Sequence, residues 1–173
     1  IDSYYVIPLG SLYPKQRATM HECYTSDGTN NVFLLGGEVD FAVTITNYLV
    51  FNIPSNSWIT KPSFINSRSN AGCVWVDNTI YLFGGNQKLS PTANQTTLNS
   101  IEIYNGSNEV WNVTNAIVSL GINGNKVRAF HKPNTNSIFI IAIGGCNIFY
   151  VDSHKVQGCP VFNDNLYSSV YID

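Results

Sequence analysis

Three apolar runs that each end in a Gly-Gly pair constrain the fold of this chain most strongly. The runs are Val32–Leu35, Ile80–Phe83 and Ile138–Ile143, and their pairs stand at 36–37, 84–85 and 144–145. The pairs lie 48 and 60 residues apart, and a period near 50 residues is typical of repeat architectures. Each run has the length of a β-strand, and glycine after it permits positive φ and close backbone approach. The pattern therefore predicts a repeated β unit.

Two further features recur in register with the glycine pairs. An arginine precedes each pair by 16 to 19 residues, and a second apolar strand follows it and ends in an aromatic residue before Asn or Asp. Seven residues beyond the aromatic comes Trp58 in the first unit and Trp111 in the second, whereas counting from Tyr150 in the third unit reaches Gln157. The recurring arginines are Arg17, Arg68 and Arg128. We interpret them as structural hydrogen-bond donors to loop carbonyls.

Each unit is predicted to contain four short strands, named a to d here. Clusters of Asn, Asp, Gly and Pro between the apolar runs are typical of hairpin turns. No segment has a sustained 3.6-residue apolar period, so we expect almost no helix. The first strands of the three units are expected at about Ala18–Tyr24, Asn70–Val76 and Val127–His131.

Taken together, the glycine pairs, the aromatic–Asn/Asp strand ends, the tryptophans and the arginines resemble the Kelch repeat over nearly the whole chain. The resemblance implies an all-β, Kelch-type β-propeller of four-stranded blades, with three clear blades and partial blades at the termini. We expect one propeller or propeller segment over residues 1–173. Its units are placed at about 17–67, 68–127 and 128–158, and a partial blade combines 159–173 with 1–13.

Composition excludes some function classes. Charged residues make up 12% of the chain, about half of the usual ~25%. The net charge is −2 without a Lys/Arg run, so no nucleic-acid footprint is visible. The apolar runs are far shorter than the ~18 residues of a membrane span, and we expect no membrane insertion. A surface of Asn, Ser, Thr and Tyr suits an extracellular location or a particle surface, with the cytoplasm as the alternative.

The sequence offers little for catalysis. His21 and His131 lie near the start of strand a, which lines the channel of a propeller, but the second unit has Ala71 and Gly72 at those places. Copper radical oxidases of Kelch type use a crosslinked Cys-Tyr pair, yet Cys23 and Tyr24 are neighbours that point to opposite faces of a strand. No nucleophile elbow, phosphate loop or zinc spacing occurs. We therefore predict a non-enzymatic protein with no cofactor and no metal.

The cysteines and the glycosylation sequons bear on the cellular compartment. Cys146 and Cys159 flank the third c–d hairpin and would face each other if its turn centres on Asp152-Ser153, so we predict a disulfide between them. Cys23 and Cys73 occupy equivalent strand-a positions and are either buried free thiols or a bridge. Three sequons give candidate N-glycosylation sites, although a chain so rich in Asn, Ser and Thr yields about three by chance. They are Asn94, Asn105 and Asn112.

Loop lengths indicate which face of the propeller binds a partner. Because strands alternate in direction, the b–c and d–a loops emerge on one face, and these are long: 38–46, 59–67, 86–98 and 115–126. In the third unit Gly145 runs directly into Cys146, so a blade does not need a long b–c loop. Loops held by rigid blades commonly carry recognition. The predicted contact residues are Asn86, Gln87, Leu89, Asn94, Gln95 and Leu98, with Glu38 and Asp40.

These observations favour a binding module that recognises a protein or a glycan through the long-loop face. The alternative is a structural building block of an extracellular assembly, filament or particle, which would include self-assembly of the chain.

Overall fold

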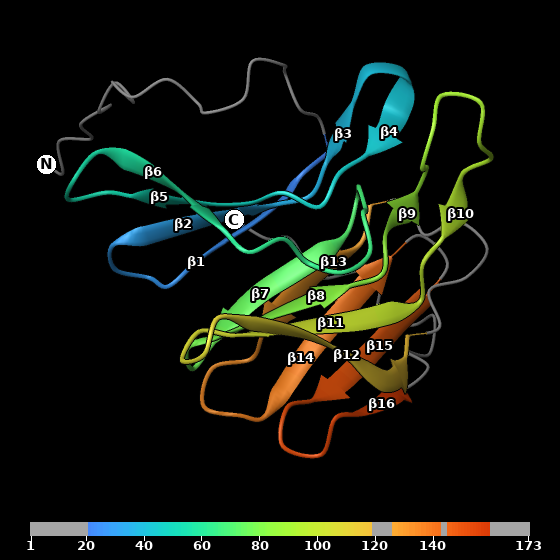
Figure 1. Cartoon of the computed structure of the whole chain (residues 1–173). Coiled ribbons are helices and arrows are strands. Elements are labelled where there is room, and N and C mark those ends of the chain that lie inside the picture. The colour runs from blue at the N-terminus through green and yellow to red at the C-terminus, as the bar shows by residue number, and fades with distance from the viewer. Residues whose placement is uncertain (1–20, 119–125, 143–144, 160–173) are drawn as a thin grey trace, which may run out of the picture.

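The computed structural model describes residues 21–118, 126–142 and 145–159, and within these ranges the chain is almost entirely β (Figure 1). Its strands form three four-stranded antiparallel sheets and two two-stranded ribbons. The one helical segment in this part of the chain is a 3₁₀ turn, η1, at Asp40–Ala42. The predicted all-β fold with four-stranded Kelch-type blades is confirmed. Of the partial blade expected from 159–173 and 1–13, all residues except Cys159 lie outside the described residues, as does Arg17.

Each blade has its strands in the spatial order of the sequence, apart from the small ribbons inserted in two b–c loops. Blade 1 consists of β1 (Cys23–Ser26), β2 (Asn31–Leu35), β5 (Tyr48–Asn52) and β6 (Ser57–Lys61). Blade 2 consists of β7 (Gly72–Val76), β8 (Thr79–Phe83), β11 (Ser100–Asn105) and β12 (Val110–Ile117). Blade 3 consists of β13 (Arg128–His131), β14 (Ser137–Ala142), β15 (Gly145–Tyr150) and β16 (Lys155–Gly158).

The inner strands start later than predicted in blades 1 and 2. A residue in the left-handed region stands two positions before each inner strand: His21 (φ 59°), Asn70 (φ 56°) and Lys126 (φ 61°). Such a residue turns the chain out of the extended conformation, so the strand cannot begin before it. The backbone N–H of Asn70 donates to the backbone carbonyl of His21, and the backbone N–H of Val127 donates to the backbone carbonyl of Asn70, both at 2.9 Å. These turns therefore link each blade to the next.

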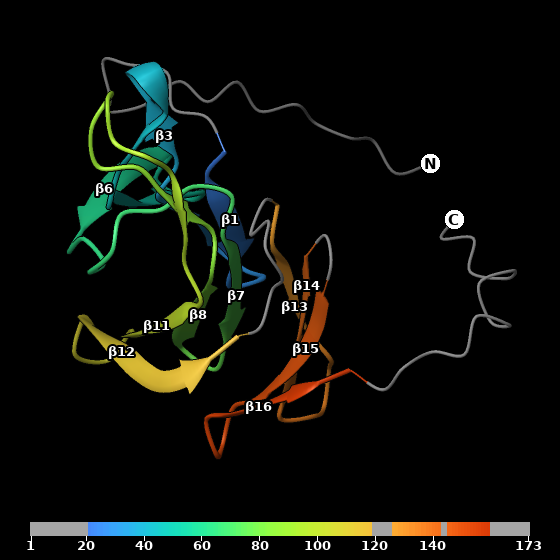
Figure 2. The ribbon, with the colours of Figure 1, turned by 90° about the vertical axis from the view of Figure 1, so that its right-hand side faces the viewer.

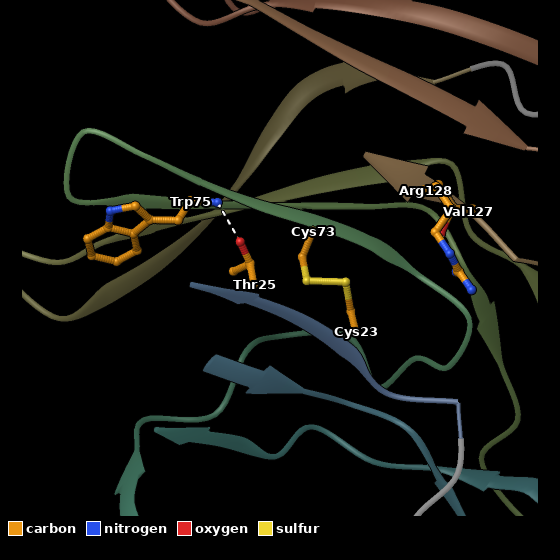
Figure 3. Close-up of a disulfide and its surroundings, with 6 residues drawn as sticks. All are labelled: Cys23, Thr25, Cys73, Trp75, Val127 and Arg128. Atoms are coloured by element: carbon orange, nitrogen blue, oxygen red, sulfur yellow. Dashed lines mark hydrogen bonds between the residues drawn. A yellow bond between two sulfur atoms is a disulfide. The ribbon is translucent and has the colours of Figure 1, made fainter. Parts of the chain in front are cut away.

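The inner strands of the three blades lie side by side around a narrow space (Figure 2). A cavity of about 110 Å³ lies there, lined by residues of β1, β7 and β13. Across it, Cys23 and Cys73 form a disulfide with a Cα–Cα distance of 5.9 Å (Figure 3). Of the two alternatives for these cysteines, the structure has the bridge. A Cβ at Gly72 would lie 2.9 Å from a Val127 methyl, so glycine is needed where β7 approaches β13.

The glycine pairs of the first two units allow close backbone approach to the same segment. Gly36 and Gly85 have φ angles of 70° and 92°, which L-residues with a Cβ rarely adopt. A Cβ would approach the Arg68 carbonyl to 2.3 Å at Gly36 and the Ser69 carbonyl to 2.6 Å at Gly85. Both pairs therefore let the end of a b strand press against the segment that leads into blade 2.

Two apolar cores fill the spaces on either side of blade 2. The first is aromatic and lies between blades 1 and 2, where Trp111 is 7% exposed and packs against the rings of Tyr48, Tyr104 and Phe64. Its indole N–H donates to the Pro62 carbonyl at 3.0 Å. The second core lies between blades 2 and 3 around Phe149. Trp111 is therefore buried between blades 1 and 2.

The strand register corrects the prediction for blade 3. All three c–d hairpins close with a four-residue turn, because the last pairs are Asn52–Ser57, Asn105–Val110 and Tyr150–Lys155. Trp58 and Trp111 thus lie opposite Phe51 and Tyr104, and the equivalent pair in blade 3 is Phe149–Val156. The residue at the tryptophan position is Val156 rather than Gln157. Counting from Tyr150 was wrong because two aromatic residues end β15.

Candidate functional site

Two small hairpins rise from the same side of the blades, on the face predicted to carry the long loops (Figure 1). The first pairs β3 (Glu38–Val39) with β4 (Val43–Thr44), and the second pairs β9 (Asn86–Gln87) with β10 (Thr96–Thr97). We call the surface formed by residues 38–44 and 86–98 the hairpin face. The b–c loops are therefore short β ribbons rather than irregular loops.

The two hairpins are joined to each other. The Thr44 amide donates to the Lys88 carbonyl at 2.9 Å, and the Lys88 amide donates to Thr44 Oγ1 at 3.0 Å. The same hydroxyl lies 2.9 Å from Ser67 Oγ, and Thr44 is 6% exposed. Two backbone hydrogen bonds of 2.9 Å between Ser69 and Asn86 fix the base of the second hairpin. These buried contacts hold the hairpin face in one arrangement.

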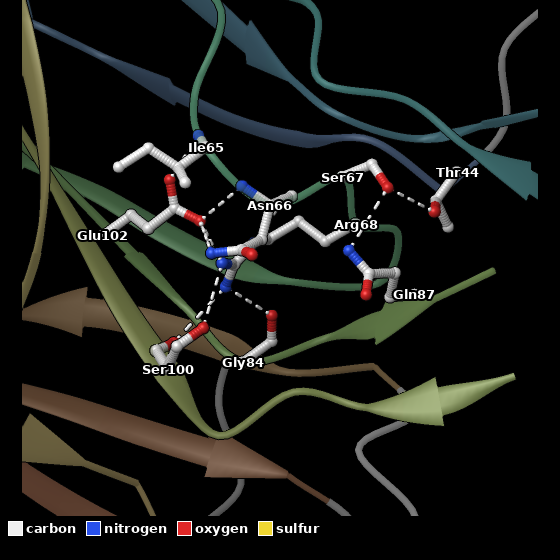
Figure 4. Close-up of polar contacts among 9 residues, drawn as sticks. All are labelled: Thr44, Ile65, Asn66, Ser67, Arg68, Gly84, Gln87, Ser100 and Glu102. Carbon is white, nitrogen blue, oxygen red and sulfur yellow. Dashed lines mark hydrogen bonds and ion pairs between the residues drawn. The ribbon is translucent and has the colours of Figure 1, made fainter. Parts of the chain in front are cut away.

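Beneath the hairpin face, Arg68 is almost fully buried and uses its guanidinium within the protein (Figure 4). It donates to the Gly84 carbonyl at 2.9 Å and to Ser100 Oγ at 3.1 Å, and it forms an ion pair with the buried Glu102. Burial lowers the pKa of the Arg68 guanidinium, and the Glu102 carboxylate opposes this shift. The structural interpretation of Arg68 is confirmed.

Glu102 completes this network, and sequence reasoning missed its role. Its carboxylate accepts hydrogen bonds from the backbone amides of Ile65 at 2.6 Å and Asn66 at 2.9 Å. Nothing local in the sequence links Glu102 to the connector before blade 2. Arg128 differs from Arg68: it is exposed and donates to the carbonyl of its neighbour Val127 at 2.9 Å.

The structure separates the predicted contact residues into surface and interior. Leu89 is 69% exposed, and Asn94, Gln95 and Asp40 are also exposed. Gln87, Leu98 and Glu38 are half-buried, and Glu38 Oε1 lies 2.5 Å from the Nδ1 atom of His21. Asn86 is 2% exposed, so its side chain is not available on the surface. The exposed parts of the predicted site are the tip of the second hairpin, residues 89–95, and Asp40 in the first hairpin.

Two clefts between blades open on the opposite side, near the c–d turns. The larger, about 690 Å³, lies between blades 2 and 3 and contains no Asp, Glu, Lys or Arg among its lining residues. Amide and hydroxyl groups dominate it, including those of Tyr81, Asn112, Thr114 and Ser153. Sequence reasoning missed this cleft, because its walls come from three strands and a turn in two blades.

The smaller cleft, about 270 Å³, lies between blades 1 and 2. An ion pair between Lys61 and Glu109 joins the two blades at this cleft, and the hydrogen bond from Lys61 to Glu109 raises the pKa of Lys61. Burial raises the pKa of Tyr48, which lines the cleft, and the neighbouring Tyr104 adds to this effect.

The structure also places the predicted disulfide and the three candidate glycosylation sites. Cys146 and Cys159 are joined, with a Cα–Cα distance of 5.4 Å. Asn94 lies at the tip of the second hairpin, Asn105 at the end of β11 and Asn112 within β12, and all three are exposed. Across the described ranges, no cluster of three or more His, Cys, Asp or Glu side chains is arranged to hold a metal. The same ranges contain no helix that could span a membrane.

The blades and their glycine pairs define a repeat protein of the β-propeller class. Residues 67–114, which contain most of blade 2 and the end of its preceding connector, match the family model described as Kelch motif. A stretch of 80 residues is 30% identical to the Kelch repeat protein M-T8 of Myxoma virus (strain Lausanne) and covers 46% of this chain and 15% of that protein. Blade 2 thus contains a Kelch motif. Kelch repeats generally mediate protein–protein interactions and are generally not enzymes.

Proposed function

We propose that this chain is a protein-interaction module that contacts its partner through the hairpin face. The observation that carries the proposal is the link between the two hairpins through Thr44, Lys88 and Ser67. A surface that is already ordered loses little conformational entropy on binding, which favours affinity. A long loop without such contacts would be ordered only at the expense of binding energy.

The composition of the exposed tip favours a protein surface of low charge. Leu89 is 69% exposed and can fill an apolar pocket of a partner. Asn94 and Gln95 are exposed amides that donate and accept hydrogen bonds without carrying charge. An apolar anchor surrounded by polar groups is the usual anatomy of a protein–protein contact.

The test replaces residues 89–95 with a short Gly-Ser linker. This exchange keeps Lys88 and both strands of the hairpin, so the contacts to Thr44 are retained. The intact chain serves to capture partners from cells of the source, and the affinity of each purified partner is then measured for the native and altered chains. We expect at least a tenfold loss of affinity, with thermal unfolding unchanged.

Ile53→Ser is the matched control, because Ile53 is an exposed apolar residue (43%) in a c–d turn on the other side. It should bind like the native chain. If the altered tip binds every partner as tightly as the native chain, the contact surface lies elsewhere.

A glycan is the second candidate ligand, and the cleft between blades 2 and 3 favours it. Its uncharged amide and hydroxyl lining suits the hydroxyl groups of a neutral sugar, and its volume lies within the range of ~300–1,000 Å³ usual for ligand sites. Asn115 is another amide residue of this lining. Binding to a glycan array that is lost in Asn115→Ala, and kept when residues 89–95 are replaced, would support this candidate.

We also propose an extracellular or particle-surface location. Both disulfides, Cys23–Cys73 and Cys146–Cys159, support it, because structural disulfides persist in oxidising compartments and are rare in the cytosol. Peptide mapping of native material without reduction should recover both linked pairs. Recovery of four alkylated free thiols would instead support the cytoplasm.

A further inference from the structure

The outer strand of blade 2 differs from the outer strands of its neighbours. β12 runs over eight residues, whereas β6 has five and β16 has four. β6 contains Lys61 and β16 contains Lys155, but β12 contains neither a charged residue nor proline. Charged residues and proline on edge strands prevent pairing with other chains. Among the three described blades, β12 alone has neither of these features, and its remaining protection is a β-bulge between Val113 and Ile117.

The free edge of β12 is open to a partner strand. Within the described residues β12 pairs only with β11, and it lies on the outside of the molecule, away from the inner strands (Figure 2). Val110 and Val113 are 46% and 45% exposed. Because the outer strand of a propeller blade faces away from the axis, further blades would not cover this edge.

We propose that two copies of this chain associate through antiparallel pairing of their β12 edges. A second copy is the occupant that the strand itself favours, because its neutral side chains are self-complementary. A two-fold axis at Asn112 places the two Asn112 amides opposite each other, where they can exchange hydrogen bonds. Trp111 of each copy then lies opposite Val113 of the other. A twofold arrangement of this kind is the commonest in soluble oligomers.

The bulge in β12 limits the extent of the pairing. The register against β11 shifts between Ser100 and Glu102, so the regular part of β12 ends at Val113. A contact of so few residues buries less than the ~1,200 Å² of a stable interface. The dimer is therefore weak, and it dissociates on dilution.

The first test is the mass of the oxidised 173-residue chain, produced without glycosylation, in sedimentation over a wide range of concentration. We expect a mass of 19.1 kDa at the lowest concentrations and a rise towards twice that value at the highest. A single mass of 19.1 kDa throughout would overturn the proposal.

The second test changes the residue on the axis. Asn112→Lys puts two like charges opposite each other, which opposes pairing, and should weaken the dimer at least tenfold. Asn112→Asp should have the same effect. A mixture of the two variants should associate again, because opposite charges then meet. That recovery cannot arise from misfolding of either variant.

Ile59→Lys is the matched control. It adds the same charge at an exposed position (42%) on the outer strand of blade 1, and the dimer should form as in the native chain. A dimer that survives Asn112→Lys, or is lost equally in Ile59→Lys, would place the contact on another surface and contradict the proposal.

Discussion

Arg68 and Arg128, which recur in register in the sequence, have different positions in the structure: Arg68 lies four residues before β7, whereas Arg128 is the first residue of β13. Arg68 finds a carboxylate in β11 of the blade that it precedes. The residues equivalent to Glu102, counted from the aromatic residue that faces the tryptophan position, are Leu49 in blade 1 and Asn147 in blade 3. Neither can neutralise a guanidinium, and Arg128 lies exposed at the surface of blade 3.

The two arginines are therefore expected to respond differently to the same substitution. Arg68→Leu should lower the free energy of unfolding by about 3–5 kcal/mol, because removal of one partner leaves the other charge buried and unpaired. Arg128→Leu should change it by less than ~0.5 kcal/mol, as is usual at exposed positions. Urea denaturation of both variants measures the difference. Equal losses would contradict the role assigned to Arg68.

Sequence reasoning predicted the role of Arg68 but not the burial of Asn86. A recurring arginine that heads every unit indicates a structural position. The position of Asn86 after a glycine pair, in a polar loop, predicts a surface residue. Its two backbone hydrogen bonds to Ser69 depend on a connector that is 17 residues away in the chain. Contacts of this kind carry no local signal.

At the scale of the strands, the a–d order was predictable from the apolar runs and the turn residues. The b strands agree closely with the apolar runs, because β2 (Asn31–Leu35) contains the run Val32–Leu35. The starts of β1 and β7 were not predictable, since left-handed residues at His21 and Asn70 decide them. Neither residue type is restricted to that conformation. The ribbons within the b–c loops were missed because strands of two residues have no measurable periodicity.

The two disulfides should differ in their effect on stability. Cys23–Cys73 closes a loop with a sequence separation of 50, and Cys146–Cys159 one of 13. In the chain-entropy account a longer loop restricts the unfolded chain more. Replacement of the first pair by Ala should cost roughly 4 kcal/mol and of the second roughly 3 kcal/mol, measured by chemical denaturation under non-reducing conditions. A larger loss from the second pair would contradict this account.

For the molecule as a whole, blade 2 is the centre of the described structure. Both of its faces are covered, by the aromatic core towards blade 1 and by the second core towards blade 3. The period of the glycine pairs predicted neighbouring blades, but not which faces would remain uncovered. Tyr24 of blade 1 is 76% exposed and Phe130 of blade 3 is 47% exposed. We expect these outer faces to meet further blades, either from the termini or from a longer chain.

Hydrogen exchange should reveal this order of stability. Backbone amides of β8 and β11 should exchange most slowly, because they lie in the middle of the central blade and Ile80, Leu82 and Ile101 are fully buried. Amides of β6 and β16, at the outer edges of the flanking blades, should exchange fastest among the strands. Slowest exchange in blade 1 or blade 3 would show that the described arrangement does not determine local stability.

The bridge between Cys23 and Cys73 also has a mechanical consequence. When the chain is pulled from its two ends, the force passes through the disulfide, and the segment between the cysteines bears none. Fully extended, the separation of 50 residues corresponds to roughly 165–180 Å of contour length. In a single-molecule pulling experiment this length should stay hidden until a reductant is added, and should then appear as one additional step. In the oxidised protein, blade 1 would thus bear no force. Its contour length would add to the extension of the chain only after a thiol reduces the disulfide.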